Sequence, residues 1–137
     1  MKAASEYGQE AISNLFEELG AFFAFGQKQF DEKKKEGVKY VALDGGMICP
    51  KENINLLIEG LNEASKKAIE QDFRENGAKN IIEREYFNYE TQISMDRTNV
   101  LESLEGYKLY FPNDFTDELI NKTFAECFKK AVENDWF

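Results

Sequence analysis

The chain has 137 residues and a net charge of −9, from 17 basic and 26 acidic side chains. Hydrophobic residues make up 42 % of the chain and aromatic residues 14 %, so the composition excludes an intrinsically disordered protein. The acidic excess disfavours direct contact with a nucleic-acid backbone, and no apolar run approaches the roughly 18 residues that a membrane span needs.

The N-terminal part of the chain predicts a helix followed by an aromatic strand. Apolar residues at helical spacing over 5–19, with Gly20 behind them, predict a helix that ends at this glycine. The next stretch, GAFFAFGQKQF, predicts a short buried strand over 21–25 and a short helix over 27–36. In such a strand Phe22 faces one side and Phe23 and Phe25 the other. We expect the strand to be a central packing element, with any binding surface elsewhere.

A hairpin and a long helix follow. The segments 38–43 and 46–49 predict two strands, and Asp44-Gly45-Gly46 between them is a strong turn motif. Pro50 suits the first turn of a helix, because its missing N–H has no intrahelical partner there. Apolar residues keep helical spacing from there to Gly77, which predicts an amphipathic helix over 50–76.

The second half of the chain is mainly helical by pattern. The stretch KNIIEREYFNYET, which begins at Lys79, favours a helix through about Asn88, although 86–93 also fits a strand. Asp96 is the expected N-cap of a short helix that ends at Gly106, followed by a connector or edge strand over 107–111. Thr116 is the expected N-cap of a final amphipathic helix over 117–134.

These elements predict an α+β protein: one mainly helical globular domain over 1–137, with a small antiparallel sheet packed by the long amphipathic helices at 50–76 and 117–134. Residues from about 96 to 137 form its helical C-terminal part. No Gly-, Ser- or Pro-rich linker divides the chain.

The chain contains no histidine, which excludes Ser-His-Asp and Cys-His catalytic systems and the usual histidine-bearing zinc sites. Its two cysteines, Cys49 and Cys127, lack the density of a disulfide-stapled secreted protein, which favours a reducing cytoplasm. Cys49 precedes a helix start, where a thiol can become reactive, but a small buried apolar residue is the simpler interpretation. We expect no catalytic residue, no cofactor and no metal site.

Three polar motifs have ordinary structural explanations. LDGGMICPKEN could cradle a phosphate but lacks the ending of a P-loop, so a turn explains it better. The acidic knot over 113–118 lacks the order of a calcium loop, and N-capping of the last helix accounts for it. The run Lys33, Lys34 and Lys35 is explained by a solvated helix face, with a small nucleic-acid patch as the alternative.

One resemblance adds to these patterns. GAFFAF, the segment at 29–32, VKYVALDGG, and PKEN with Leu56 and Leu57 behind it resemble small uncharacterised proteins encoded by phages and other bacterial mobile elements. The resemblance covers about residues 15–90. It implies an inhibitor of host defence, anti-CRISPR proteins included, that binds a basic nucleic-acid-handling enzyme such as a CRISPR effector in the cytoplasm of the bacterial host.

The leading hypothesis is therefore a non-enzymatic inhibitor that acts by steric and acidic-surface occupation, without membrane or direct nucleic-acid contact. A terminal Trp-Phe must either pack on the core, which we favour, or stand exposed as a contact. The alternatives are a metal-dependent, carboxylate-based hydrolase or nuclease and a homo-oligomeric accessory module. The candidate contact residues for the inhibitor are Asp117, Glu118, Glu126, Glu133, Trp136 and Phe137.

Overall fold

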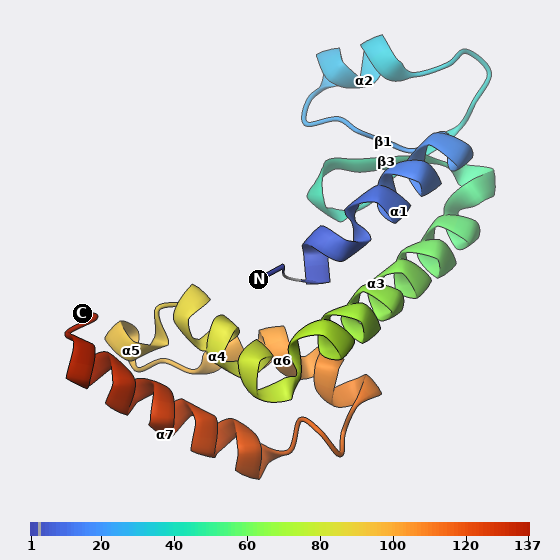
Figure 1. The fold of residues 1–137 in the computed structure, drawn as a ribbon. Coiled ribbons are helices and arrows are strands. Elements are labelled where there is room, and N and C mark those ends of the chain that lie inside the picture. Colours follow the sequence, from blue (N-terminus) through green and yellow to red (C-terminus); the bar gives the residue numbers. More distant parts are fainter. Residues whose placement is uncertain (3) are drawn as a thin grey trace. The chain divides into compact units, whose positions relative to one another are not determined.

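The computed structural model describes residues 1–2 and 4–137 and shows an α+β fold, mainly helical with a small antiparallel sheet (Figure 1). The chain divides into two compact units, which we call the sheet unit, residues 5–68, and the helical unit, residues 1–4 and 69–137. No helix of the described residues is both long enough and apolar enough to cross a membrane.

The sheet unit contains two helices, three short strands and the first part of a third helix. Strand β3 lies in the centre of the sheet, and β1 and β2 pair with it on either side in antiparallel register. Its elements are α1 (Ala4–Leu19), β1 (Phe22–Phe23), α2 (Gln27–Lys33), β2 (Tyr40–Ala42), the 3₁₀ turn η1 (Asp44–Gly46), β3 (Met47–Pro50), the 3₁₀ turn η2 (Lys51–Asn53) and α3 (Ile54–Asn76).

Helix α1 ends as its sequence predicts. Gly20 has a positive φ of 73°, and the Ala21 N–H donates to the Phe16 carbonyl at 2.9 Å, so the chain reverses directly into β1. The core behind the sheet combines Phe16 and Leu19 of α1 with Cys49 and Leu57. The hairpin of β2 and β3 is confirmed, with Val41 opposite Cys49.

Two expectations for this unit are wrong. The aromatic segment is not central, because β1 contains just two residues and lies at a sheet edge, where Phe23 and Phe25 are exposed. Pro50 does not open a helix: it is the last residue of β3, and α3 begins at Ile54 after the η2 turn. The reason is that Pro50 pairs with Tyr40 across the hairpin, which holds it in an extended conformation.

The helical unit includes the last turns of α3, from Ile69 onward. Its apolar core joins α4, α6 and α7 around Phe115, Phe124 and Leu104, all of which are buried. Its helices are α4 (Ala78–Asn88), α5 (Thr91–Ser94), α6 (Thr98–Tyr110) and α7 (Asp117–Asn134).

The helix predicted to end at about Asn88 is confirmed and begins at Ala78, and the final helix over 117–134 is confirmed. The Thr116 hydroxyl caps α7 by accepting from the Leu119 N–H at 3.2 Å. The connector or edge strand expected over 107–111 is wrong, because α6 continues through Gly106 to Tyr110. Asp96 lies one residue ahead of the Arg97 cap, although its carboxylate does accept from the Thr98 N–H.

Candidate protein-binding surfaces

Of the acidic candidate residues at the start and in the middle of α7, two form ion pairs and one does not. Asp117 forms an ion pair with Lys108, and Glu126 forms one with Lys79 at 3.2 Å. Glu118 is exposed and belongs to no ion pair of the described residues. The four acidic candidates are spread along the helix instead of forming one cluster, since Glu118 and Glu133 are separated by about 22 Å at 1.5 Å per residue.

The end of α7 folds back on itself. Asp135 adopts the left-handed conformation, with φ 53° and ψ 50°, and the Trp136 N–H donates to the Ala131 carbonyl at 3.0 Å. This six-residue closure is the Schellman motif that reverses a chain at a helix end. It carries the Phe137 ring back to the ring of Phe128, nine residues earlier in the chain, with the two ring centres 6.2 Å apart.

Trp136 is both held in place and accessible. Its ring meets Phe87 edge-on at 5.6 Å, the Lys130 ammonium lies 5.8 Å from its centre, and its carbonyl accepts from Gln92 at 3.4 Å. Even so, 44 % of the residue is exposed. Packing on the core and exposure therefore occur together, where the sequence presented them as alternatives.

These residues form an exposed apolar surface, which we call the C-terminal patch: Phe128, Val132, Trp136 and Phe137. Val132 is one helical turn beyond Phe128, and the patch residues are between 38 % and 61 % exposed. Glu133 and Asp135 are exposed in the same turn of the chain. The patch combines fixed aromatic rings with neighbouring carboxylates.

Most of the net negative charge belongs to the helical unit. It carries 15 acidic and 9 basic side chains, a net charge of −6, while the sheet unit carries 11 and 8, a net charge of −3. The C-terminal patch thus belongs to the more acidic unit.

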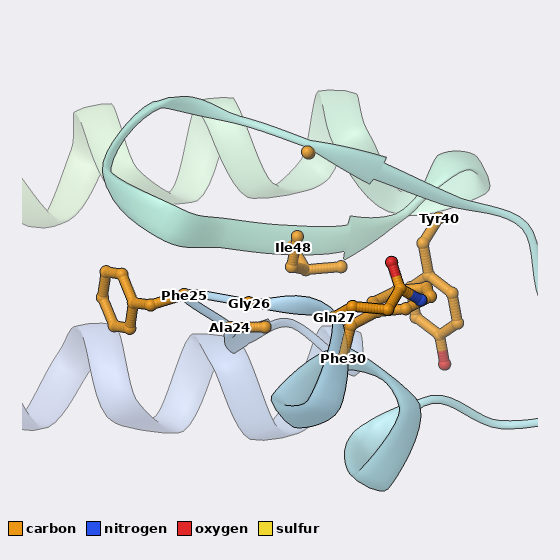
Figure 2. Close-up of a pocket in the computed structure, with 8 residues that line it drawn as sticks. Ala24, Phe25, Gly26, Gln27, Phe30, Tyr40 and Ile48 are labelled. Carbon is orange, nitrogen blue, oxygen red and sulfur yellow. The ribbon is translucent and has the colours of Figure 1, made fainter.

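A second exposed aromatic surface lies in the segment over 21–25, which the sequence predicts to be a packing element. Phe25 is 75 % exposed, and its ring stacks on Phe23 with centres 6.3 Å apart and planes 3° apart. Beside it is a pocket of about 430 Å³, which we call the aromatic pocket (Figure 2). Figure 2 shows Phe25 at one end of the pocket and Phe30 and Tyr40 at the other, with Ile48 between them. The residues that line it are Ala24, Phe25, Gly26, Gln27, Phe30, Tyr40, Ala42 and Ile48.

The short length of β1 explains why this surface was missed. Extended to five residues, the strand would have buried its phenylalanines between neighbours. Instead the chain leaves the sheet after Phe23, and the Phe25 N–H donates to the Gln29 side chain at 2.7 Å. The density of phenylalanines in the segment was the signal that could have pointed to a surface.

A buried ionic network lies inside the helical unit. Asp72 is fully buried and accepts two hydrogen bonds from the Arg84 guanidinium, both 3.0 Å long, one from the Tyr107 hydroxyl at 2.6 Å and one from Asn76 at 2.7 Å. Burial alone would raise the pKa of Asp72, but these hydrogen bonds outweigh it and hold that pKa below its usual value. Glu85 accepts from the other side of the guanidinium at 2.8 Å. The network joins α3, α4 and α6.

Each of the two apolar cores contains one buried cysteine, Cys49 in the sheet unit and Cys127 in the helical unit. Burial raises the pKa of the Cys49 thiol, and burial with the nearby Glu83 charge raises the pKa of Cys127 to about 12. Both thiols are therefore held in their unreactive protonated form. Across residues 1–2 and 4–137, no three Asp, Glu or Cys side chains converge closely enough to hold a metal ion.

Comparison with known proteins gives one match. A family of unknown function (DUF7659) matches residues 4–131, which include the whole aromatic pocket and Phe128 of the C-terminal patch, but not Val132, Trp136 and Phe137. No curated protein and no solved structure matches the chain.

Proposed function

The chain belongs to this family of unknown function, and we propose that it is a non-enzymatic protein that binds a basic protein partner through the C-terminal patch. In its specific form, the proposal is an inhibitor from a phage or other mobile element that blocks a nucleic-acid-binding enzyme of host defence, as anti-CRISPR proteins do. The observation that carries the binding function is the exposed aromatic patch at the end of α7.

Fixed aromatic side chains are the residues that most often dominate the affinity of protein interfaces. Trp136 suits this role because three neighbours already hold it, so binding immobilises few additional rotamers. Phe137 and Phe128 extend the same surface. Large apolar side chains gathered on a folded surface typically mark an interaction site.

The charge of the helical unit supports a basic partner. A net charge of −6 on this unit attracts a positively charged surface and speeds the encounter with it, particularly at low salt. Glu133 and Asp135 place carboxylates next to the rings, where the rim of an interface is typically polar. The channel of a nucleic-acid-binding enzyme offers this positive charge, and occupying it inhibits the enzyme without any chemical step.

The test uses a nuclease-treated lysate of a bacterium with an active nucleic-acid-targeting defence. It measures which proteins of this lysate the immobilised chain retains. We compare the wild-type chain with the double variant Trp136→Ala, Phe137→Ala. The matched control is Leu109→Ala, because Leu109 is a similarly exposed apolar residue of the same unit, at 72 %, outside the patch.

Support requires a basic nucleic-acid-binding protein that the wild type and L109A retain, that the double variant loses, and that an added oligonucleotide displaces. The proposal is contradicted if the chain retains no basic protein. It is also contradicted if the double variant retains the same protein as the wild type and the oligonucleotide does not displace it. The inhibitory part is tested by plasmid interference in the same bacterium. Interference that is equally efficient with and without the wild-type chain contradicts it.

A further inference from the structure

We propose that two copies of this chain associate through the aromatic pocket, with Phe25 of each copy inserted into the pocket of the other. The proposal concerns the sheet unit and is independent of the C-terminal patch.

The first observation is a protruding ring that is already fixed. Phe25 has an exposure of 75 %, yet its backbone N–H is bonded to Gln29 and its ring stacks on Phe23. The ring also lies close to Gly46, where an added Cβ would come within 2.5 Å of it. A side chain held in this way loses little rotamer freedom when a partner covers it.

The second observation is a cavity of matching chemistry next to that ring. Phe30 and Tyr40 meet edge to face at 5.7 Å, which forms an aromatic end wall, and Ile48 forms the floor. The volume of about 430 Å³ is ample for a phenyl ring, because an apolar cavity of roughly 150 Å³ accommodates benzene. The pocket therefore has room for the ring of a second copy next to its own Phe25.

The third observation is the charge of the lining. None of the eight residues that line the pocket is an Asp, Glu, Lys or Arg, although such residues make up 31 % of the chain. Burying this surface leaves no charge unpaired, and a neutral ring is the complementary occupant. Two charges lie beside the lining and form an ion pair with each other at 3.2 Å: Asp31 accepts from the Gln27 side chain, and the Lys34 ammonium is 5.7 Å from the Phe30 ring centre.

The protruding ring and the cavity belong to the same patch, and this decides the symmetry. A patch that carries both parts is self-complementary, so a twofold axis pairs each Phe25 with the opposite pocket. Both pockets are then filled and no unpaired copy of the contact remains. The expected assembly is a closed dimer.

Sedimentation velocity across a broad concentration series tests the dimer. We expect the wild type to shift from the 15.8 kDa monomer to twice that mass as concentration rises. Phe25→Ala removes two rings from the interface and should weaken association on the order of a thousandfold, about thirtyfold for each ring. Ala42→Trp, which fills the pocket from an exposed strand position, should have the same effect.

L109A is the matched control for loss of an exposed apolar side chain, and it should associate like the wild type. Circular dichroism confirms that each variant is folded. A wild type that stays monomeric at every concentration overturns the proposal, and so does a dimer that both F25A and A42W leave intact. The double variant of Trp136 and Phe137 should dimerise normally, so failure of one proposal leaves the other unaffected.

Discussion

Replacement of Asp72 by Asn should be among the most damaging single substitutions in the helical unit. Asp72 is fully buried and receives hydrogen bonds from Arg84, Tyr107 and Asn76. An asparagine removes the negative charge opposite Arg84 and turns one acceptor into a donor that faces other donors. Breaking a buried ion pair typically costs about 3–5 kcal/mol. Because Glu85 still accepts from Arg84, we expect a loss of about 3 kcal/mol, or a melting temperature about 10 °C lower.

Urea unfolding followed by circular dichroism measures the difference. The matched control is Asp117→Asn, which also removes a carboxylate from an ion pair but at a side chain that is 82 % exposed. An exposed pair contributes about 0–1 kcal/mol, so this variant should unfold almost like the wild type. If D72N costs less than about 1 kcal/mol, or no more than D117N, the reasoning from burial is refuted.

The same substitution has a pH dependence of definite sign. The pKa of Asp72 is lower in the folded state than in the unfolded chain, so the stability that its charge contributes is present above the unfolded pKa of about 3.9. It is lost as the pH falls through the lower, folded pKa. The free-energy difference between wild type and D72N should therefore be constant at neutral pH and shrink below about pH 4. A difference that grows on acidification would contradict this sign.

Two further predictions concern the thiols and the turn beneath Phe25. Cys49 and Cys127, both buried with raised pKa values, should react with a thiol reagent at pH 8 only after denaturation, and rapid modification of the native protein would contradict their burial. Gly46→Ala should cost more stability in thermal unfolding than Gly37→Ala. Both residues have a positive φ, which costs about 1–2 kcal/mol for alanine, but only at Gly46 does the new Cβ meet the Phe25 ring. Equal losses would show that this contact is unimportant.

The elements with strong local signals could be predicted from the sequence. The final helix has a capping threonine, a long apolar stripe and no internal glycine, and its bounds were correct. The hairpin was predictable because Asp44-Gly45-Gly46 forces a turn between two β-rich segments. In both cases the local preference and the tertiary environment favour the same structure.

The errors arose where tertiary packing overrides the local signal. From the sequence, Gly106 predicts the end of a helix, but it lies within α6. A Cβ there would come within 2.9 Å of Ile69, so this glycine permits close packing. Helix-stop glycines and packing glycines cannot be distinguished in one sequence. The length of β1 likewise depends on tertiary contacts, because it is set by the backbone hydrogen bonds that β1 and Ala24 form with β3 and η1.

The candidate sites also combine features that have a local sequence signal with features that depend on tertiary packing. Trp136 and Phe137 are conspicuous in the sequence as a Trp-Phe pair behind a polar helix end, and their role in binding stays a prediction. The Schellman reversal that joins Phe137 to Phe128 could not be predicted, because it depends on a left-handed Asp135. The network of Asp72, Arg84 and Tyr107 was not predictable, because it joins residues 12 and 35 positions apart on three helices. Nothing in their spacing distinguishes them from solvated charges.

The two-residue length of β1 also affects how safely the chain folds. Residues 21–25 are apolar, aromatic, uncharged and free of proline, the composition of segments that stack into cross-β aggregates. In the folded protein the Lys33 ammonium donates to the Phe23 carbonyl at 2.7 Å, which occupies a backbone acceptor of β1 with a charged side chain from the next helix. Charged side chains at an edge strand discourage the addition of foreign strands. The short helix α2 thus supplies the charge that protects this edge strand from pairing with another chain.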